Sequence, residues 1–234
     1  MKALLLAAGY GTRLKPLTNY IPKCLVPING KPLLEYWLDN LYQEGIKEFL
    51  INTHYLSEQV EKYIENSKYK KMVTLVYEKE LLFTGGTILK NKDFFGNEEF
   101  MVVHADNLCF CNFKEFMHEH KLRPKQCIMT MMIFLTDNPK SCGIVDLDEN
   151  NVVTRFYEKV QNPPSNLANG AVYIFSNEML LFLGSFEKDK IDLSTEIIPN
   201  LLNKIMTYEN NIYLKDIGTL ENYSLAQVEI LEFI

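Results

Sequence analysis

Long apolar segments and an excess of basic residues are both missing from this sequence. No run approaches the ~20 apolar residues that a membrane-spanning helix needs. The apolar segment 1–9 leads directly into a glycine-rich turn, so we expect a buried strand there and not a signal peptide. The chain has 24 Lys and Arg against 30 Asp and Glu, a formal net charge of -6, which argues against a broad surface for nucleic acid or anionic membrane. We therefore expect a cytoplasmic protein with neither partner, in which a local cluster of cations holds any polyanionic ligand.

Cysteine is scarce, and the five cysteines form no clear metal-binding or disulfide pattern. Only Cys109 and Cys111 are close, whereas a zinc site usually has a second pair of cysteines or clustered histidines. His118 and His120 follow in the same segment, so a soft-metal site is an alternative. We favour reduced, mostly buried thiols, which are usual in cytosolic proteins.

Short apolar runs alternate with longer segments of helical period, which is typical of an α/β protein with a largely parallel sheet. In the first half we expect strands at 3–8, 49–52, 73–77 and 100–104, and helices at 31–44 and 57–65, the second of them opened by a Ser57 cap. In the second half we expect helices at 177–183, 195–204 and 221–233, and mainly antiparallel strands at 128–134, 143–147, 152–157, 171–175 and 211–214, with a hairpin turn at 148–151.

The sequence has no linker long enough to separate independent domains, so we expect a single domain over residues 1–234. The predicted fold class is α/β. It has a Rossmann-like, mixed and mainly parallel sheet flanked by helices, with an antiparallel extension that carries a second substrate, and the two halves enclose a cleft.

A glycine-rich turn leaves the first predicted strand and can point several backbone N–H groups at phosphate oxygens. Gly9 and Gly11 fit this role, although two glycines alone fit any strand end that needs a positive φ equally well. Arg13 and Lys23 add cations to the same region. A dinucleotide-binding loop would have glycine where Leu14 stands, and no Gly-Lys-Ser/Thr follows, so neither that loop nor a Walker P-loop is present.

With these residues the chain resembles the sugar-1-phosphate nucleotidyltransferase family over nearly its whole length, which implies a GT-A-like fold. The motifs that carry the resemblance are LAAGYGTRLKPLT at 6–18, PKCLVPI at 22–28, TGG at 84–86, HADN at 104–107, EK at 158–159, NGAVY at 169–173 and DIGT at 216–219. NTHY at 52–55 and the stretch 158–173 are most similar to the guanylyltransferase branch. The family usually has Gly where Ala105 stands, and Gly or, in some branches, an acidic residue where Phe83 stands.

The resemblance implies that residues 1–110 mainly bind the nucleotide and that residues 111–234 mainly bind the sugar phosphate. The nucleotide pocket would comprise Leu6, Ala7, Ala8, Gly9, Gly11, Thr12, Arg13, Thr84 and Gly85. The sugar-phosphate site would comprise Glu158, Lys159, Asn169 and Gly170. We expect the catalytic residues to be Arg13, Lys23, Asp106 and Asp216.

Asp106 and Asp216 each follow a predicted strand, and carboxylates at the carboxyl ends of strands point into the ligand crevice of open α/β sheets. Two carboxylates with phosphate oxygens and water make a hard site suited to Mg²⁺. A turn or cap carboxylate is the alternative for either residue.

The expected chemistry depends on positioning and charge neutralisation. A sugar 1-phosphate has a second pKa near ~6 and is already a nucleophilic dianion at neutral pH. Arg13 would neutralise the departing pyrophosphate, Lys23 would contact the α-phosphate and Lys159 the sugar phosphate.

We therefore expect transfer of a nucleotidyl group from an NTP, with GTP favoured, to a mannose-type or heptose-type 1-phosphate, in nucleotide-sugar biosynthesis. Uridylyl, cytidylyl or thymidylyl transfer to another sugar 1-phosphate is the alternative within the family. A catalytically inactive nucleotide-sugar sensor is the alternative of another class, and the loop spacing disfavours a nicotinamide-dependent reductase. The chain ends too soon for a C-terminal acyltransferase domain, so we expect one activity, in a monomer or a homo-oligomer.

Overall fold

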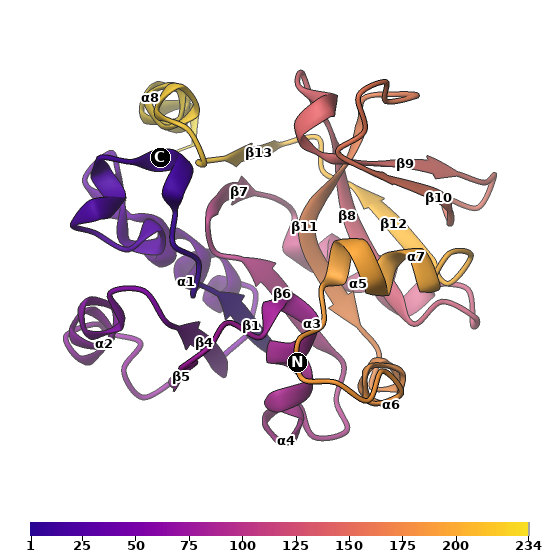
Figure 1. Ribbon diagram of the computed structural model, residues 1–234, viewed down its shortest axis with the longest axis horizontal. Coiled ribbons are helices and arrows are strands. Elements are labelled where there is room, and N and C mark those ends of the chain that lie inside the picture. Colours follow the sequence, from indigo (N-terminus) through magenta and orange to yellow (C-terminus); the bar gives the residue numbers. More distant parts are fainter. Residues whose placement is uncertain (234) are drawn as a thin grey trace. The chain divides into compact units, whose positions relative to one another are not determined.

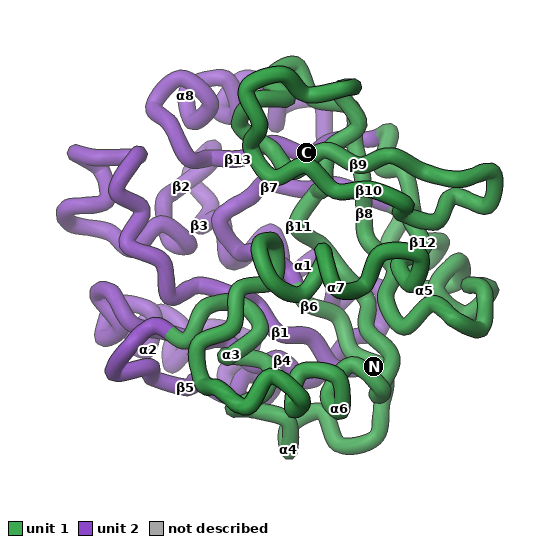
Figure 2. Tube along the Cα trace, turned by 45° about the vertical axis from the view of Figure 1, so that its right-hand side comes forward, with its two compact units in different colours: residues 1, 82–102, 112–211 green, residues 2–81, 103–111, 212–234 purple. Residues whose placement is uncertain are grey.

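The computed structural model describes residues 1–233, which form two compact units (Figure 2). Of the described residues, unit 1 comprises 1, 82–102 and 112–211, and unit 2 comprises 2–81, 103–111 and 212–233. The chain passes from one unit to the other inside strand β6 (Phe100–His104). The predicted division of roles between 1–110 and 111–234 stays a prediction.

Unit 2 is built on three parallel strands, β1 (Lys2–Leu6), β4 (Phe49–Thr53) and β5 (Val73–Tyr77) (Figure 1). β4 is the middle strand, with Ala3 opposite Phe49 on one side and Phe49 opposite Val73 on the other. All five residues of β4 are buried, as expected for a strand covered on both faces.

Two helices of unit 2 follow these strands in the chain. Helix α1 (Leu33–Gln43) buries an apolar stripe at the spacing that the sequence predicts, and Gly45, with φ 90°, follows its C-cap residue Glu44. Gly45 N–H donates to Tyr42 O and Ile46 N–H to Leu41 O, both at 3.0 Å, so the last carbonyls of the helix are paired. Helix α2 (Ser57–Glu65) has the predicted bounds.

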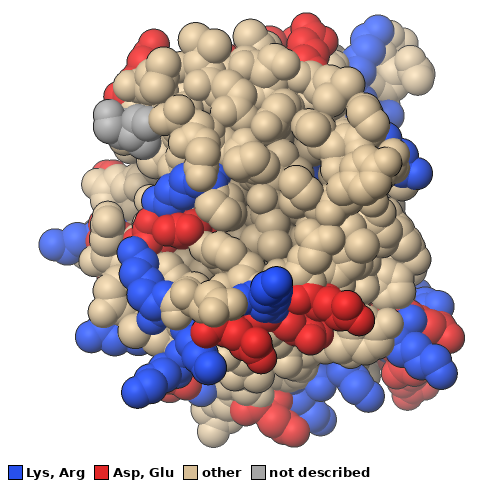
Figure 3. Space-filling model, turned by 90° about the vertical axis from the view of Figure 1, so that its left-hand side faces the viewer, with Lys and Arg blue, Asp and Glu red and all other residues tan. Residues whose placement is uncertain are grey.

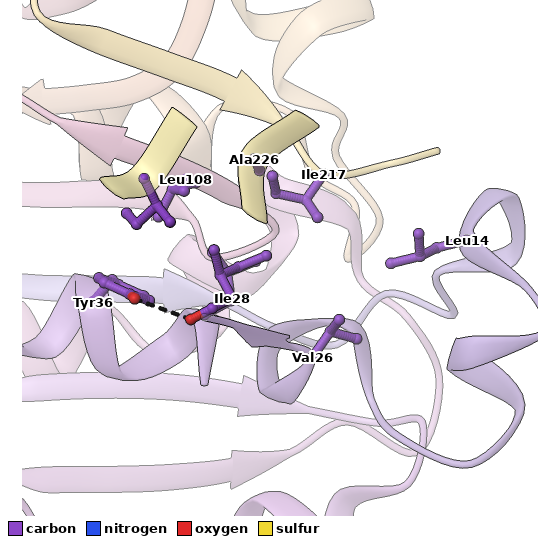
Figure 4. Packing of buried hydrophobic residues seen from close by; sticks show 9 residues of the cluster. Leu14, Val26, Ile28, Tyr36, Leu108, Ile217 and Ala226 are labelled. Carbon is purple, nitrogen blue, oxygen red and sulfur yellow. Dashed lines mark hydrogen bonds between the residues drawn. The ribbon is translucent and has the colours of Figure 1, made fainter. Parts of the chain in front are cut away.

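The remaining elements of unit 2 pack around one apolar cluster (Figure 4). They are β2 (Pro27–Ile28), β3 (Lys31–Pro32), β7 (Asn107–Phe110), β13 (Tyr213–Asp216), α8 (Leu220–Glu229) and η6 (Ile230–Glu232). The buried members of the cluster are Leu14, Val26, Ile28, Leu33, Tyr36, Leu108, Ile217, Ala226 and Ile230. Tyr36 also donates its hydroxyl to Ile28 O at 3.0 Å, so its polar atom is paired inside the cluster.

Unit 1 contains the antiparallel strands that the sequence predicts. Strand β11 (Leu167–Phe175) pairs antiparallel with β8 (Met129–Leu135) and β9 (Gly143–Leu147), and β9 pairs antiparallel with β10 (Val153–Glu158). β12 (Ile205–Glu209) runs parallel to β8. The helical segments of unit 1 are α3 (Phe83–Lys90), α4 (Lys92–Phe95), α5 (Phe113–Leu122), η4 (Pro139–Ser141), α6 (Glu178–Gly184), η5 (Leu193–Ile197) and α7 (Ile198–Asn200). Unit 2 also has the short turns η1 (Thr12–Leu14), η2 (Leu17–Asn19) and η3 (Lys23–Leu25).

Several sequence-based predictions are wrong. The helix expected at 195–204 is a π-helical turn and one short turn of α-helix, because Pro199 lacks the N–H that would continue the ladder. The chain then enters β12, a strand that the sequence analysis missed along with α3, α5 and β7. Ser57 does not cap α2, since Leu56 is the N-cap residue and no side chain caps this end.

Two further features of the protein are the charged side chains on one of its faces and the apolar character of its helices. On the face shown in Figure 3, acidic and basic side chains are interspersed and form no broad patch of one sign. Among residues 1–233, no helix is both long and apolar enough to cross a bilayer.

Glycine packing in unit 1 gives a direct test of the fold. A Cβ on Gly86 would lie 2.1 Å from the backbone oxygen of Asp189, whereas a Cβ on Gly184 would meet nothing within 4 Å. We expect Gly86→Ala to lower the free energy of unfolding by roughly 1–3 kcal/mol. Gly184→Ala should leave it unchanged or raise it by about 0.4–1 kcal/mol. Urea denaturation of both variants measures the difference, and equal effects would contradict the packing of α3.

Candidate functional site

The loop after β1 is shaped by one glycine in the left-handed region. Gly11 has φ 62°, and a Cβ there would lie 2.8 Å from Thr18 Cγ2 and 3.1 Å from Lys23 Cβ. Both the torsion and the close approach therefore require glycine. Thr18 Oγ1 donates to Gly11 O at 2.8 Å, which closes the loop on itself. Gly9 differs, since a Cβ there would meet nothing within 4 Å.

The four residues predicted to be catalytic meet within unit 2. Lys23 is only 7% exposed, and its Nζ donates to Asp106 Oδ2 at 2.8 Å and to Asp216 Oδ1 at 3.1 Å. Arg13 Nη2 donates to the second oxygen of Asp216, Oδ2, at 3.2 Å. The structure thus brings together side chains that are up to 203 positions apart in the sequence.

A two-stranded ribbon explains why the two carboxylates converge. Asp106 lies in the two-residue turn between β6 and β7, and Asp216 is the last residue of β13. β13 pairs antiparallel with β7, and this register sets Asp216 opposite Asn107, the neighbour of Asp106. A register slip of one residue would turn Asp216 to the other face of the ribbon.

The four charged side chains of the site differ in their exposure to solvent. Asp106 and Asp216 are 40% and 42% exposed and Arg13 is 62% exposed, whereas only 7% of the Lys23 side chain is exposed. Burial of the Asp106 carboxyl opposes its ionisation, but the Lys23 ammonium, helped by His104 and Arg13, outweighs burial and holds the pKa of Asp106 below its usual value. Asp106 is therefore a carboxylate at neutral pH.

Gly218 is a residue of this site that the sequence analysis did not single out. A Cβ there would lie 2.7 Å from Arg13 Nη2 and 2.8 Å from both carboxylate oxygens of Asp216. Glycine at this position therefore leaves room for the ion pair between these two side chains. Gly218 is part of the DIGT motif, but the need for glycine at this position comes from its closeness to Arg13, which lies near the other end of the chain.

Asp216 is further held by the start of α8. Asn222 Nδ2 donates to Asp216 O at 2.9 Å, and the Thr219 side chain caps the helix by accepting from Asn222 N–H at 3.2 Å. The last strand and the last helix of unit 2 thus fix the backbone of this carboxylate.

The backbone groups predicted to bind the nucleotide are partly engaged within the protein. Ala7 N–H donates to Asn52 Oδ1 at 2.8 Å, and Leu6 O accepts from Ala105 N–H at 3.1 Å. In unit 1, Gly85 N–H donates to Ile191 O at 2.8 Å, and a Cβ on Gly85 would lie 2.9 Å from Ile191 Cγ2. Packing against this segment therefore accounts for the glycine that follows Thr84.

The residues predicted to bind the sugar phosphate lie in unit 1. Lys159 has φ 49°, and its Nζ contacts Glu158 Oε1 at 3.0 Å. Asn169 Nδ2 donates to the Tyr173 hydroxyl at 2.8 Å, and Asn169 Oδ1 accepts from Ala171 N–H at 2.9 Å. These bonds span a bulge in β11 that includes Gly170, so the Asn169 side chain is held by the bulge.

The donor set around Lys23 suits a hard divalent cation better than a soft one. Among residues 1–233, no group of three or more His, Cys, Asp or Glu side chains could hold a metal ion, and this includes the cysteine–histidine segment at 109–120. Asp106 and Asp216 converge on one ammonium, so two carboxylates face one point. They could supply part of a Mg²⁺ shell that phosphate oxygens and water complete.

The pairing of Asp106 predicts how stability depends on pH. A carboxyl whose pKa is lowered by folding stabilises the protein above its unfolded value of 3.8, and this contribution is lost as the pH falls through the lower folded pKa. Asp106→Asn should therefore be less stable than wild type at pH 6, and the gap should close below pH ~4. Urea denaturation from pH 7 to 3 measures it, with Glu149→Gln, exposed in the β9–β10 turn, as the control. A gap that stayed constant with pH would contradict the pairing.

Known proteins resemble this chain along most of its length. The model of the nucleotidyl transferase family matches residues 2–232. Mannose-1-phosphate guanylyltransferase catalytic subunit beta of Drosophila melanogaster is 32% identical over 220 residues, which cover 92% of this chain and 57% of that protein. A bifunctional sugar-1-phosphate nucleotidylyltransferase/acetyltransferase of Sulfurisphaera tokodaii is 33% identical over 226 residues, which cover 93% of this chain and 52% of that protein. The chain spans little more than half the length of either relative.

The fold of this chain is also similar to that of a solved structure. Apo UDP-glucose pyrophosphorylase is similar with a TM-score of 0.82 and 25% identity, over 100% of this chain and 99% of that one. This similarity confirms the predicted mixed, mainly parallel sheet flanked by helices, with antiparallel strands, in a GT-A-like fold. The chain belongs to the nucleotidyl transferase family.

Proposed function

We propose that this protein transfers a nucleotidyl group from an NTP to a sugar 1-phosphate and releases pyrophosphate. The observation that carries the proposal is the meeting of Arg13, Lys23, Asp106 and Asp216 beside a glycine-containing loop. The family match and the names of the two relatives support the same reaction class. The product would be a nucleotide sugar for polysaccharide or glycoconjugate synthesis.

The charge count of this cluster supports a need for Mg²⁺. Two cations, Arg13 and Lys23, are paired with two carboxylates, so the four side chains sum to no net charge. Both substrates are anions, and a neutral cluster does not offset their repulsion. Asp106 and Asp216 would hold the metal, which when bound would supply the positive charge that the side chains lack.

The chain's own groups can then provide positioning without acid or base catalysis. An oxygen of the sugar phosphate dianion attacks the α-phosphorus of the NTP, the α–β phosphoanhydride bond breaks, and pyrophosphate leaves with the electron pair. In this proposal Arg13 neutralises the pyrophosphate and Lys23 contacts the α-phosphate. Lys159, with Glu158, Asn169 and Gly170, would bind the sugar phosphate.

Guanylyl transfer to a mannose-type or heptose-type 1-phosphate is the specificity we favour. Its support is the mannose-1-phosphate guanylyltransferase relative at 32% identity. The similarity to UDP-glucose pyrophosphorylase keeps uridylyl transfer as the second candidate.

An activity matrix tests the proposal. The purified protein with Mg²⁺ should release pyrophosphate with GTP and mannose 1-phosphate or a related hexose or heptose 1-phosphate. A coupled pyrophosphate assay across the common NTPs and sugar 1-phosphates measures this, and omission of the sugar phosphate is the control. No pyrophosphate release with any pair of substrates would refute the proposal. Release with UTP alone would keep the reaction class and change only the proposed nucleobase specificity.

The role of Asp106 has its own test. Asp106→Asn keeps the shape of the side chain but removes one of the two carboxylates at Lys23. We expect turnover to fall by about 10²-fold or more, as when one electrostatic group of an active site is removed. Asp93→Asn, exposed in the first turn of α4, is the control and should keep full turnover. Near-normal turnover of the Asp106 variant would remove this carboxylate from the mechanism.

A further inference from the structure

The segment 52–55, Asn-Thr-His-Tyr, contacts the loop after β1 through three of its side chains. It lies at the carboxyl end of β4, beside β1, and all of these residues belong to unit 2. The contacts are distinct from the four charged residues, and none of the roles proposed above uses them. Their common target is the loop from Ala7 to Thr18.

His54 bridges the loop to the end of β5. Its Nδ1 lies 2.7 Å from the backbone oxygen of Glu78, and its Nε2 lies 2.8 Å from the Tyr10 hydroxyl. A carbonyl oxygen only accepts, so Nδ1 carries the proton, and in the neutral ring Nε2 accepts from the hydroxyl of Tyr10. The Tyr10 and His54 rings also meet edge to face, with centroids 5.2 Å apart.

Asn52 and Tyr55 hold the loop on either side of Tyr10. Asn52 Oδ1 accepts from Ala7 N–H at 2.8 Å, and Asn52 Nδ2 donates to Glu78 Oε1 at 2.9 Å. The Tyr55 hydroxyl donates to Thr18 O at 2.9 Å, and its ring lies 5.7 Å from that of Tyr10. The loop is thus held at its start, its middle and its end.

Tyr10 is the position where such a contact matters most, because it stands between Gly9 and Gly11. Glycines have the largest backbone freedom, so ordering this turn around a ligand costs conformational entropy. Tyr10 is 47% exposed and makes its hydrogen bond only through the hydroxyl. Fixing that side chain fixes the backbone between two glycines before the ligand arrives, which lowers the cost of binding.

We propose that His54, with Asn52 and Tyr55, forms a positioning device that preorganises the phosphate-binding loop through Tyr10. The proposal rests on the proposed function for its ligand, the triphosphate of an NTP. These are positioning residues, because they act on the loop and not on the reacting atoms. They should therefore change the affinity for the NTP and leave the rate of the chemical step almost unchanged.

The test compares Tyr10→Phe, His54→Leu, their double variant and His54→Gln in steady-state kinetics. Tyr10→Phe and His54→Leu should each raise the KM for the NTP about 3- to 10-fold, the loss of one hydrogen bond, with kcat and the KM for the sugar 1-phosphate within about 2-fold. The double variant should match the worse single variant, because both remove the same bond. Gln can accept from Tyr10 and donate to Glu78 O, so His54→Gln should recover most of the affinity.

Tyr20→Phe is the matched control, since Tyr20 lies two residues after this loop and is 76% exposed. Amide hydrogen exchange at residues 9–19 gives a readout without catalysis, and protection should fall in Tyr10→Phe but not in Tyr20→Phe. An inactive wild type with this pattern of exchange would refute the proposed function and keep the positioning device. An active wild type with unchanged KM and unchanged exchange in Tyr10→Phe would overturn the device, even if His54→Leu failed to fold.

Discussion

The buried ammonium of Lys23 is the constraint on which the rest of unit 2 depends. A charge taken out of water is costly unless it is paired and hydrogen-bonded. Here Asp106 and Asp216 supply the pairing, at 2.8 and 3.1 Å. Since the three side chains come from the N-terminal loop, the end of β6 and the end of β13, the loop, the β7–β13 ribbon and α8 must all be in place for the charge to be paired.

A buried apolar residue lies next to or near three of the four charged residues of the site. Leu14 adjoins Arg13 and Ile217 adjoins Asp216, and both are buried in the same cluster (Figure 4). Leu108 lies two residues after Asp106 and belongs to that cluster too. Burial of these neighbours, worth roughly 1.5–3 kcal/mol for each large side chain, fixes the backbone, so exposed functional groups such as Arg13 and Asp216 can be positioned without being buried themselves.

The fold could be predicted wherever local pattern and tertiary packing agree. β5, β6, β9 and α2 have the predicted bounds. In α2 the buried residues, Val60 and Ile64, are four positions apart, as the helical period requires. α3 was missed: the sequence analysis assigned Thr84 and Gly85 to the nucleotide pocket, whereas in the structure Gly85 and Gly86 pack closely against the 189–191 segment. Gly218 was missed for a similar reason. A Cβ at this position would clash with Arg13, a residue far away in the sequence, so the need for glycine is visible only in the folded structure.

Phe83, which departs from the family pattern, has an unusual backbone torsion. The resemblance to the family favours Gly there, and in this structure Phe83 has φ 60°, in the left-handed region where Gly carries no penalty. A phenylalanine in that region costs about 1–2 kcal/mol. The ring is 53% exposed, so the burial of apolar area does not offset all of that cost.

Strain of this kind persists at functional positions, and Lys159 and Ala171, in two other family motifs of unit 1, also have positive φ. The four paired charges of the candidate site thus lie in unit 2, and these three residues of positive φ lie in unit 1.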